Sequence, residues 1–192
     1  MTDKPSYLGL LNAVSNAETR AHCYLTAWAE VTDDPDVRAV LVKVAAREGE
    51  HGMAFAKRID ELGFEVQPTD DPDFDRRMTL VSSRDKTDLE KLEGIGLLDF
   101  CPAEGEPDVF DGFFRDHSID IQTGELLGRY IAEERDTLRL VSGCASILRG
   151  RESQTATGDH VASLERKIDS VYRAVEELRQ VVCAQTMRTT TA

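Results

Sequence analysis

Four stretches of the chain carry apolar residues at alternating steps of three and four, the spacing of a helix that buries one face. The second stretch shows this most clearly, and its apolar positions are Val37, Leu41, Val44, Phe55 and Leu62. Glu48 and His51 occupy positions in the middle of the same row. A buried charge is costly unless it is paired or bound to a metal. This helix therefore needs partners for two polar side chains inside a core.

The other three rows differ in how they are interrupted. The first contains Glu18 near its middle, and the third contains Glu134. The fourth has no interruption, and its positions are Val161, Leu164, Ile168, Val171, Val175, Leu178 and Val182. Three of the four predicted helices thus carry a carboxylate into the core, and one of them also carries a histidine.

Proline and glycine mark where the helices are expected to begin and end. Asp34 followed by Pro35 is typical of an N-cap and a first-turn proline. Gly63 and Gly150 stand where a C-terminal cap glycine would end the second and third helices. The helices predicted from these signals span residues 6–32, 36–63, 118–150 and 158–188.

The lengths of the connections indicate how these helices are arranged. Short links at about 33–36 and 151–157 imply two antiparallel helix pairs. The segment 64–117 is then a long crossover, in which Thr87 and Glu90 form a predicted capping box. We therefore predict an all-α fold: an antiparallel four-helix bundle with a long crossover between helices two and three, in one domain over 1–192.

Glu48 and His51 are three residues apart, so they lie on one helical face and could bind the same metal ion. The alternative is a buried, hydrogen-bonded pair without metal. Glu18 by itself is also consistent with a polar residue that specifies helix register. Glu133 is adjacent to Glu134, and periodicity does not fix helical phase to the residue, so the sequence places Glu134 on the buried face only to within one position.

Two helical hairpins, a long crossover, an inward Glu on one helix and Glu-x-x-His on its neighbour together resemble the ferritin-like superfamily, and rubrerythrin is the nearest type. In that family two iron or manganese ions are held by one Glu from each of two helices and a Glu-x-x-His from each of the other two. The resemblance implies that Glu18, Glu48, His51 and Glu134 are metal ligands. It also implies oxidation of Fe(II) by dioxygen or peroxide.

The sequence departs from the family pattern in its fourth helix, where neither Glu165 nor Glu176 is followed three residues later by His. The third helix could instead be the counterpart of the second, with Thr137 where His51 stands. In either alignment one histidine and one carboxylate are missing. We therefore predict one iron or manganese ion per chain, held by three Glu and one His, rather than two.

Charge and cysteine content exclude several other classes. A formal charge of −13 argues against nucleic-acid binding and against anionic membrane surfaces. The four cysteines form no Cys-x-x-Cys pair, which excludes a rubredoxin-like module. The first residues lack the apolar core of a signal peptide, so a cytoplasmic location is expected.

Two functions are consistent with these patterns. The first is a ferritin-like metal-binding protein that acts as an iron- or manganese-dependent oxidoreductase. The second is a non-catalytic helical bundle with a degenerate metal site that acts in protein association. The uninterrupted apolar row over 161–182 suits either a bundle core or a homodimer or higher oligomer. The sequence assigns no catalytic residue, substrate or electron-transfer partner.

Overall fold

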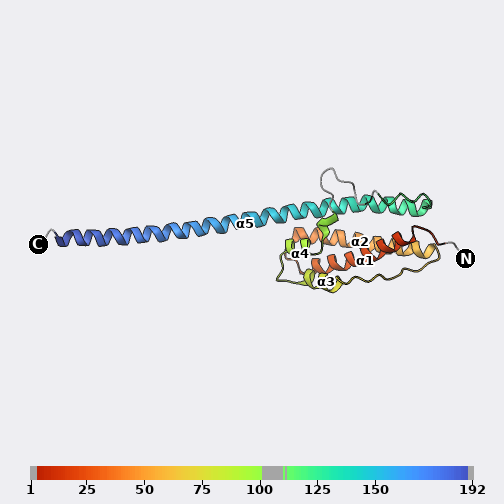
Figure 1. Cartoon of the computed structure of the whole chain (residues 1–192), viewed down its shortest axis with the longest axis horizontal. Helices are drawn as coiled ribbons and strands as arrows, with labels where there is room; N and C mark the ends of the chain where they lie inside the picture. The colour runs from red at the N-terminus through yellow and green to blue at the C-terminus, as the bar shows by residue number, and fades with distance from the viewer. Residues whose placement is uncertain (1–3, 101–109, 111, 190–192) are drawn as a thin grey trace. The chain divides into compact units, whose positions relative to one another are not determined.

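The computed structural model describes residues 4–100, 110 and 112–189, and every regular element in that part of the chain is a helix. The elements in chain order are α1 (Leu8–Val31), α2 (Pro35–Glu61), α3 (Phe74–Ser82), α4 (Asp88–Gly94), the short 3₁₀-helix η1 (Leu97–Phe100) and α5 (Ile121–Thr189) (Figure 1). The all-α prediction is confirmed for the described residues. The four-helix arrangement is not.

The α1–α2 hairpin forms where the sequence predicts it. Asp34 caps α2: its carboxylate accepts hydrogen bonds from the backbone N–H groups of Asp36 at 2.9 Å and Val37 at 3.2 Å. Pro35, which has no N–H to leave unpaired, is the first residue of the helix. Across the turn, Arg38 Nε donates to the carbonyl of Ala29 at 3.1 Å. These bonds fix the reversal that lays α2 beside α1.

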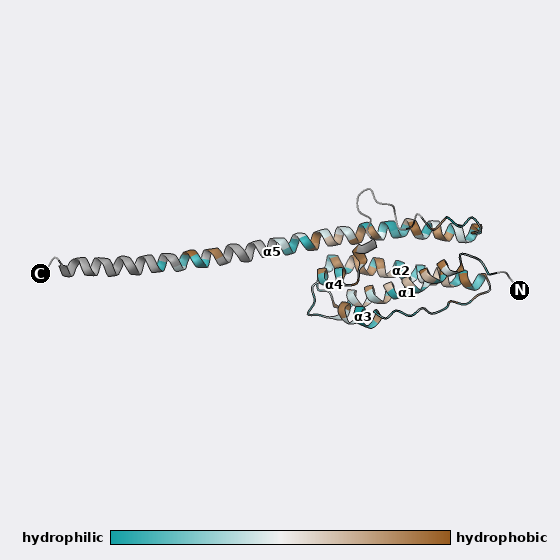
Figure 2. Ribbon diagram, viewed as in Figure 1, coloured by the Kyte–Doolittle hydropathy of each residue, from teal (hydrophilic) through white to brown (hydrophobic). Residues whose placement is uncertain are grey.

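Two apolar clusters hold the helices together. One includes Leu25, Trp28 and Val44, and the other includes Leu11 and Phe55. Each cluster also takes residues from the first part of α5, and Figure 2 shows the apolar residues spread along α1, α2 and this part of α5. Glu18 and Glu48 each fall, along their helices, between the residues of the two clusters. The fold therefore places both carboxylates between the two apolar clusters of the core.

The crossover is built on its own helices and is anchored to α1. The predicted capping box is confirmed, because Thr87 Oγ1 accepts from the N–H of Glu90 and Glu90 Oε2 accepts from the N–H of Thr87. Asp88 accepts hydrogen bonds from Trp28 Nε1 at 2.6 Å and from Thr32 Oγ1 at 2.7 Å. These contacts hold α4 at the C-terminal end of α1.

The predicted break between the third and fourth helices is wrong. Residues 151–157 are helical, and α5 continues from Ile121 to Thr189. Gly63, just beyond α2, has the expected positive φ of 83°, whereas Gly150 is an ordinary helical residue. A glycine inside a helix costs only about 1 kcal/mol relative to alanine, and no proline enforces a turn here.

The predicted burial of the fourth apolar row is also not observed where its side chains are described. Leu164 is 45% exposed and Ile168 is 54% exposed. Contacts divide the chain into two parts, Met1–Leu148 and Arg149–Ala192. All four predicted ligands belong to the first part. Within the described residues, no helix has the length and apolar character needed to cross a bilayer.

Candidate metal site

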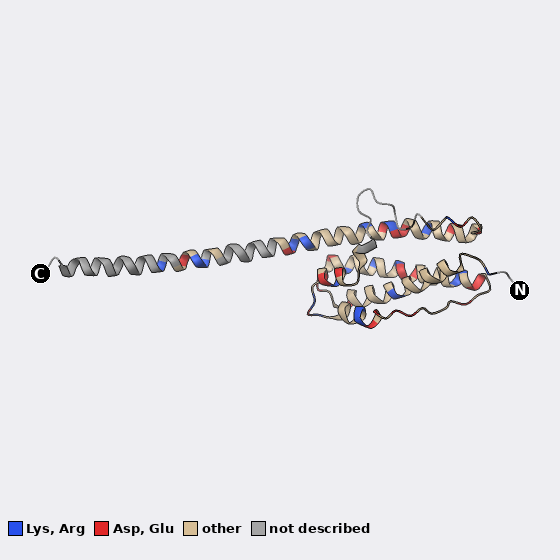
Figure 3. Ribbon diagram, viewed as in Figure 1, with Lys and Arg blue, Asp and Glu red and all other residues tan. Residues whose placement is uncertain are grey.

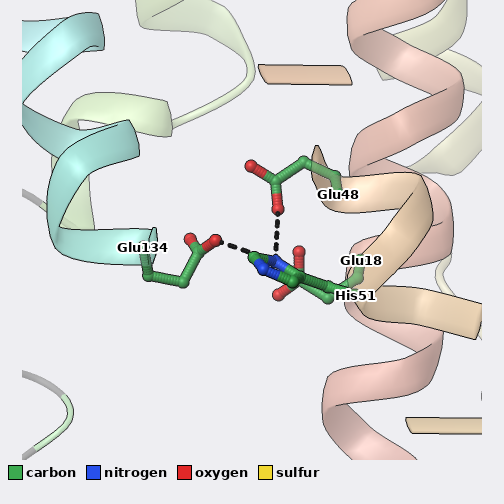
Figure 4. A group of neighbouring side chains, drawn as sticks. All are labelled: Glu18, Glu48, His51 and Glu134. Carbon is green, nitrogen blue, oxygen red and sulfur yellow. Dashed lines mark ion pairs between the residues drawn. The ribbon is translucent and has the colours of Figure 1, made fainter. Parts of the chain in front are cut away.

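The structure brings the four predicted ligands together in the core. Glu18 comes from α1, Glu48 and His51 from α2, and Glu134 from α5 (Figure 4). All four are buried, and one ligand atom from each lies within 4.8 Å of the others. Three carboxylates and one imidazole at this spacing could hold a metal ion.

The centre of the group contains buried polar atoms that face one another as ion pairs but have no hydrogen-bond partners. His51 Nδ1 lies 3.2 Å from Glu134 Oε1 and 3.6 Å from Glu48 Oε2. None of these three atoms makes a hydrogen bond of acceptable geometry. Leaving a buried polar atom unsatisfied costs about 1–3 kcal/mol, and more for charged groups. Their convergence on one point is the arrangement expected of ligands that share a cation.

Glu133, which the sequence did not identify as part of the site, contacts the other side of the imidazole. Its Oε2 lies 2.7 Å from His51 Nε2, and Arg129 Nε donates to its Oε1 at 3.1 Å. In a metal-bound state, a proton on Nε2 that bonds to Glu133 would leave the Nδ1 lone pair for an ion held beside Glu48 and Glu134. Outer carboxylates of this kind fix the tautomer of metal-binding histidines. The Glu133–Glu134 pair thus places one carboxylate near each nitrogen of His51.

Tyr130 supports the site from within α5. Its hydroxyl donates to Glu18 Oε1 at 2.7 Å, and its ring meets those of His51 and Phe55 edge-on, with centroids 5.0 and 5.2 Å apart. Burial and the nearby carboxylate charges raise the pKa of Tyr130 above its usual value, so it remains a hydrogen-bond donor. Glu18 is therefore oriented by a neutral phenol.

Burial and the close spacing of the four ligands shift their pKa values. Desolvation raises the pKa of Glu18 to about 10, and the hydrogen bond and negative charge of Glu48 act in the same direction. Burial opposes the charging of His51, but the close carboxylates of Glu134, Glu48 and Glu133 favour its charged form and raise its pKa to about 10. Desolvation also raises the pKa of Glu134. At neutral pH and without metal, Glu18 and His51 both retain protons that a cation could replace.

Two glycines let α1 and α2 approach closely beside the ligands. A Cβ on Gly52 would lie 2.8 Å from Thr19 Oγ1, and one on Gly49 would lie 3.0 Å from His22 Nδ1. Ser15 Oγ also donates to the carbonyl of Gly52 at 3.1 Å. Gly49 lies inside the Glu-x-x-His motif and Gly52 directly follows it, and these glycines were the sequence signal for the close approach, which periodicity alone did not reveal.

Arg47 joins α2 to α5 next to the site. Its Nη1 donates to the carbonyl of Glu133 at 2.8 Å and to Thr137 Oγ1 at 2.9 Å, and its Nη2 donates to Asp136 at 3.0 Å. Thr137, the position that would hold a second histidine in one alignment, is thus buried against Arg47 and is not one of the grouped ligands. These bonds fix the position of α5 along α2, and so the height at which Glu133 and Glu134 face His51.

Comparison with known proteins does not extend this description. No protein-family model matches the chain, and searches of curated proteins and of solved structures find no match. The comparisons therefore do not confirm the ferritin-like resemblance.

Proposed function

We propose that the protein is a ferritin-like metal-binding protein that holds one iron or manganese ion between Glu18, Glu48, His51 and Glu134. The observation that supports this most strongly is the convergence of Glu48 Oε2, His51 Nδ1 and Glu134 Oε1, all buried and all without hydrogen-bond partners. A divalent cation would satisfy the three atoms at once. Oxygen ligands with one imidazole suit iron and manganese, whereas the soft thiolate ligands preferred by several other metals are absent from the group.

The protein's contribution would be to hold the ligands in place and exclude water. Glu133 would keep Nδ1 of His51 free for the ion, and Tyr130 would orient Glu18. The apolar clusters on either side would limit the access of water to the ion. A bound iron ion would supply one-electron redox chemistry, and oxidation of Fe(II) by dioxygen or peroxide is the activity that the ferritin-like resemblance implies.

The ligand count favours a single ion. Three carboxylates supply a charge of −3, which exceeds the +2 of one divalent ion but falls short of the +4 of two. No second Glu-x-x-His occurs in the sequence, and Thr137 is bonded to Arg47. A second ion would lack both a histidine and enough anionic ligands.

One observation favours the competing function, a non-catalytic bundle that acts in protein association. His51 lies 2.7 Å from Glu133 and 3.2 Å from Glu134, and its pKa is raised to about 10. A protonated imidazole could therefore act as the internal cation and neutralise the carboxylates without metal. The two functions make opposite predictions for metal uptake.

Metal analysis of full-length protein, purified without a histidine tag and loaded anaerobically with Fe(II) or Mn(II), tests the proposal. We expect one ion per chain in the wild type and none in His51→Ala, with circular dichroism nearly unchanged because most of the core is apolar. His117→Ala removes an exposed histidine outside the group and is the matched control, which should bind like wild type. Two ions per chain would contradict the single-ion site, and no uptake by the wild type would favour the association protein.

Loss of Fe(II) on addition of dioxygen or peroxide then separates binding from catalysis. An oxidoreductase should oxidise Fe(II) faster than free ions do, and His51→Ala should remove the acceleration. Uptake of one ion without acceleration would leave a metal-binding protein that is not an oxidoreductase.

A further inference from the structure

The second part of the chain carries a helical face that the metal site does not use. In the continuous helix α5, apolar residues follow a strict heptad pattern of alternating three- and four-residue steps. Four of them are β-branched and occupy the first core position, Val161, Ile168, Val175 and Val182. The other three occupy the second core position, Leu164, Val171 and Leu178. A seam this narrow and regular is typical of a coiled coil.

The described members of the seam are open to solvent. Leu164 is 45% exposed and Ile168 is 54% exposed, and both are large aliphatic side chains. Burying such a side chain stabilises a fold or interface by about 1.5–3 kcal/mol. A repeated row of exposed aliphatic residues on a soluble helix is expected to gain a partner that presents the same repeat.

The charges beside the seam indicate what that partner is. Figure 3 shows acidic and basic residues together along the described part of α5. In the sequence, Glu165 and Arg179 occupy the same flanking heptad position, seven residues on either side of Tyr172. They are opposite in sign and about 21 Å apart along one helix, too far to pair within a chain. A second copy running antiparallel would bring each Glu165 beside Arg179 of the other copy, so one symmetry axis forms two ion pairs.

In a parallel arrangement, Glu165 and Arg179 would not pair with each other across the two copies. This arrangement would set Arg179 beside Ala174 of the second copy and Glu165 beside His160. We propose that residues 161–182 form a two-stranded antiparallel coiled coil with a second copy of this chain. The contact joins two chains through their second parts and leaves the ligands of the candidate metal site, which all precede Leu148, out of the interface.

Sedimentation of the full chain over a range of concentrations tests whether the seam associates. We expect a dimer for the wild type and a monomer for Ile168→Lys, which places a charge in the seam. Asp169→Lys, one residue further and outside the seam, is the control for an added lysine and should remain dimeric. Circular dichroism verifies that each variant keeps its helix. A wild-type monomer, a dimer that survives Ile168→Lys, or a trimer or tetramer would overturn the proposal.

Charge reversal tests the direction of pairing. Glu165→Arg and Arg179→Glu should each weaken the dimer roughly tenfold, because each change replaces two attractions with two repulsions. The double variant Glu165→Arg/Arg179→Glu should recover most of the wild-type affinity. Single effects that merely add in the double variant would overturn the antiparallel arrangement. Metal content should stay at one ion per chain in Ile168→Lys, so failure of either proposal can be recognised separately.

Discussion

At the residue scale, His51 lies between two neighbouring carboxylates of α5, and the different role of each carboxylate in metal binding can be tested. Glu133 contacts Nε2, the nitrogen turned away from the grouped ligands, whereas Glu134 faces Nδ1. Replacing Glu133 by Ala removes the acceptor that fixes the tautomer, and we expect metal affinity to fall about 10–100-fold. Titration calorimetry with Mn(II) measures the change.

Glu50→Ala is the matched control for Glu133→Ala. Glu50 also forms an ion pair with Arg129 but makes no contact with His51. The Glu50→Ala substitution should reduce metal affinity by less than about threefold, since an exposed charge acts weakly through solvent. Equal losses in the two variants would mean that Glu133 acts through its charge alone and not by orienting the imidazole.

Protonation of the same residues predicts how the metal-free protein responds to pH. His51 has a pKa raised from 6.5 to about 10 and Glu18 one raised from 4.5 to about 10, so the folded state binds more protons than the unfolded state between these values. The free energy of unfolding should therefore fall as pH rises from 7 to 10. Denaturant unfolding in the presence of a chelator measures it.

Glu18→Gln isolates the contribution of that carboxyl, because the amide keeps an acceptor for Tyr130 but cannot ionise. The decline in stability between pH 7 and 10 should be smaller in this variant than in the wild type. An identical decline in both proteins would show that Glu18 ionises normally in the folded state.

At the scale of elements, the sequence predicts helices well where strong signals agree. Asp34 with Pro35 and Thr87 with Glu90 combine specific side-chain geometry with the apolar period, and both caps are present. The break at 151–157 was predicted from glycines and polar residues that a helix also tolerates. Glu133 was missed for a related reason: apolar spacing gives the buried face of a helix but not which of two adjacent carboxylates points to which atom.

Substitution of Gly150 tests whether α5 is continuous, and Gly63, a glycine with positive φ just beyond α2, provides the contrast. Gly150→Ala should stabilise the helix by about 0.5–1 kcal/mol, because Gly150 has helical backbone angles and a new Cβ meets no atom within 4 Å. Gly63→Ala, which has equal space but φ of 83°, should destabilise the protein by about 1 kcal/mol or more. Hydrogen exchange near each position and denaturant unfolding measure both effects. Destabilisation by Gly150→Ala would instead indicate a turn at that residue.

At the scale of the whole molecule, the candidate site connects three helices that are distant in the sequence. Glu18, Glu48 with His51, and Glu134 come from α1, α2 and α5, so an ion bound to all of them exists only when residues 8–148 are folded together. Because unfolding would disperse the ligands, binding energy adds directly to the stability of the fold.

Metal should therefore protect the folded state in a concentration-dependent way. At a free Mn(II) concentration 100 times the Kd, the free energy of unfolding should rise by about 2.7 kcal/mol, as mass action requires. His51→Ala should show no such increase, while His117→Ala should show all of it because that histidine is exposed and outside the group. Thermal unfolding at several metal concentrations measures the effect. An equal increase in His51→Ala would mean that the ion binds elsewhere, and the three helices would then be joined by apolar packing and by side-chain hydrogen bonds such as those of Arg47 and Tyr130, without a shared ion.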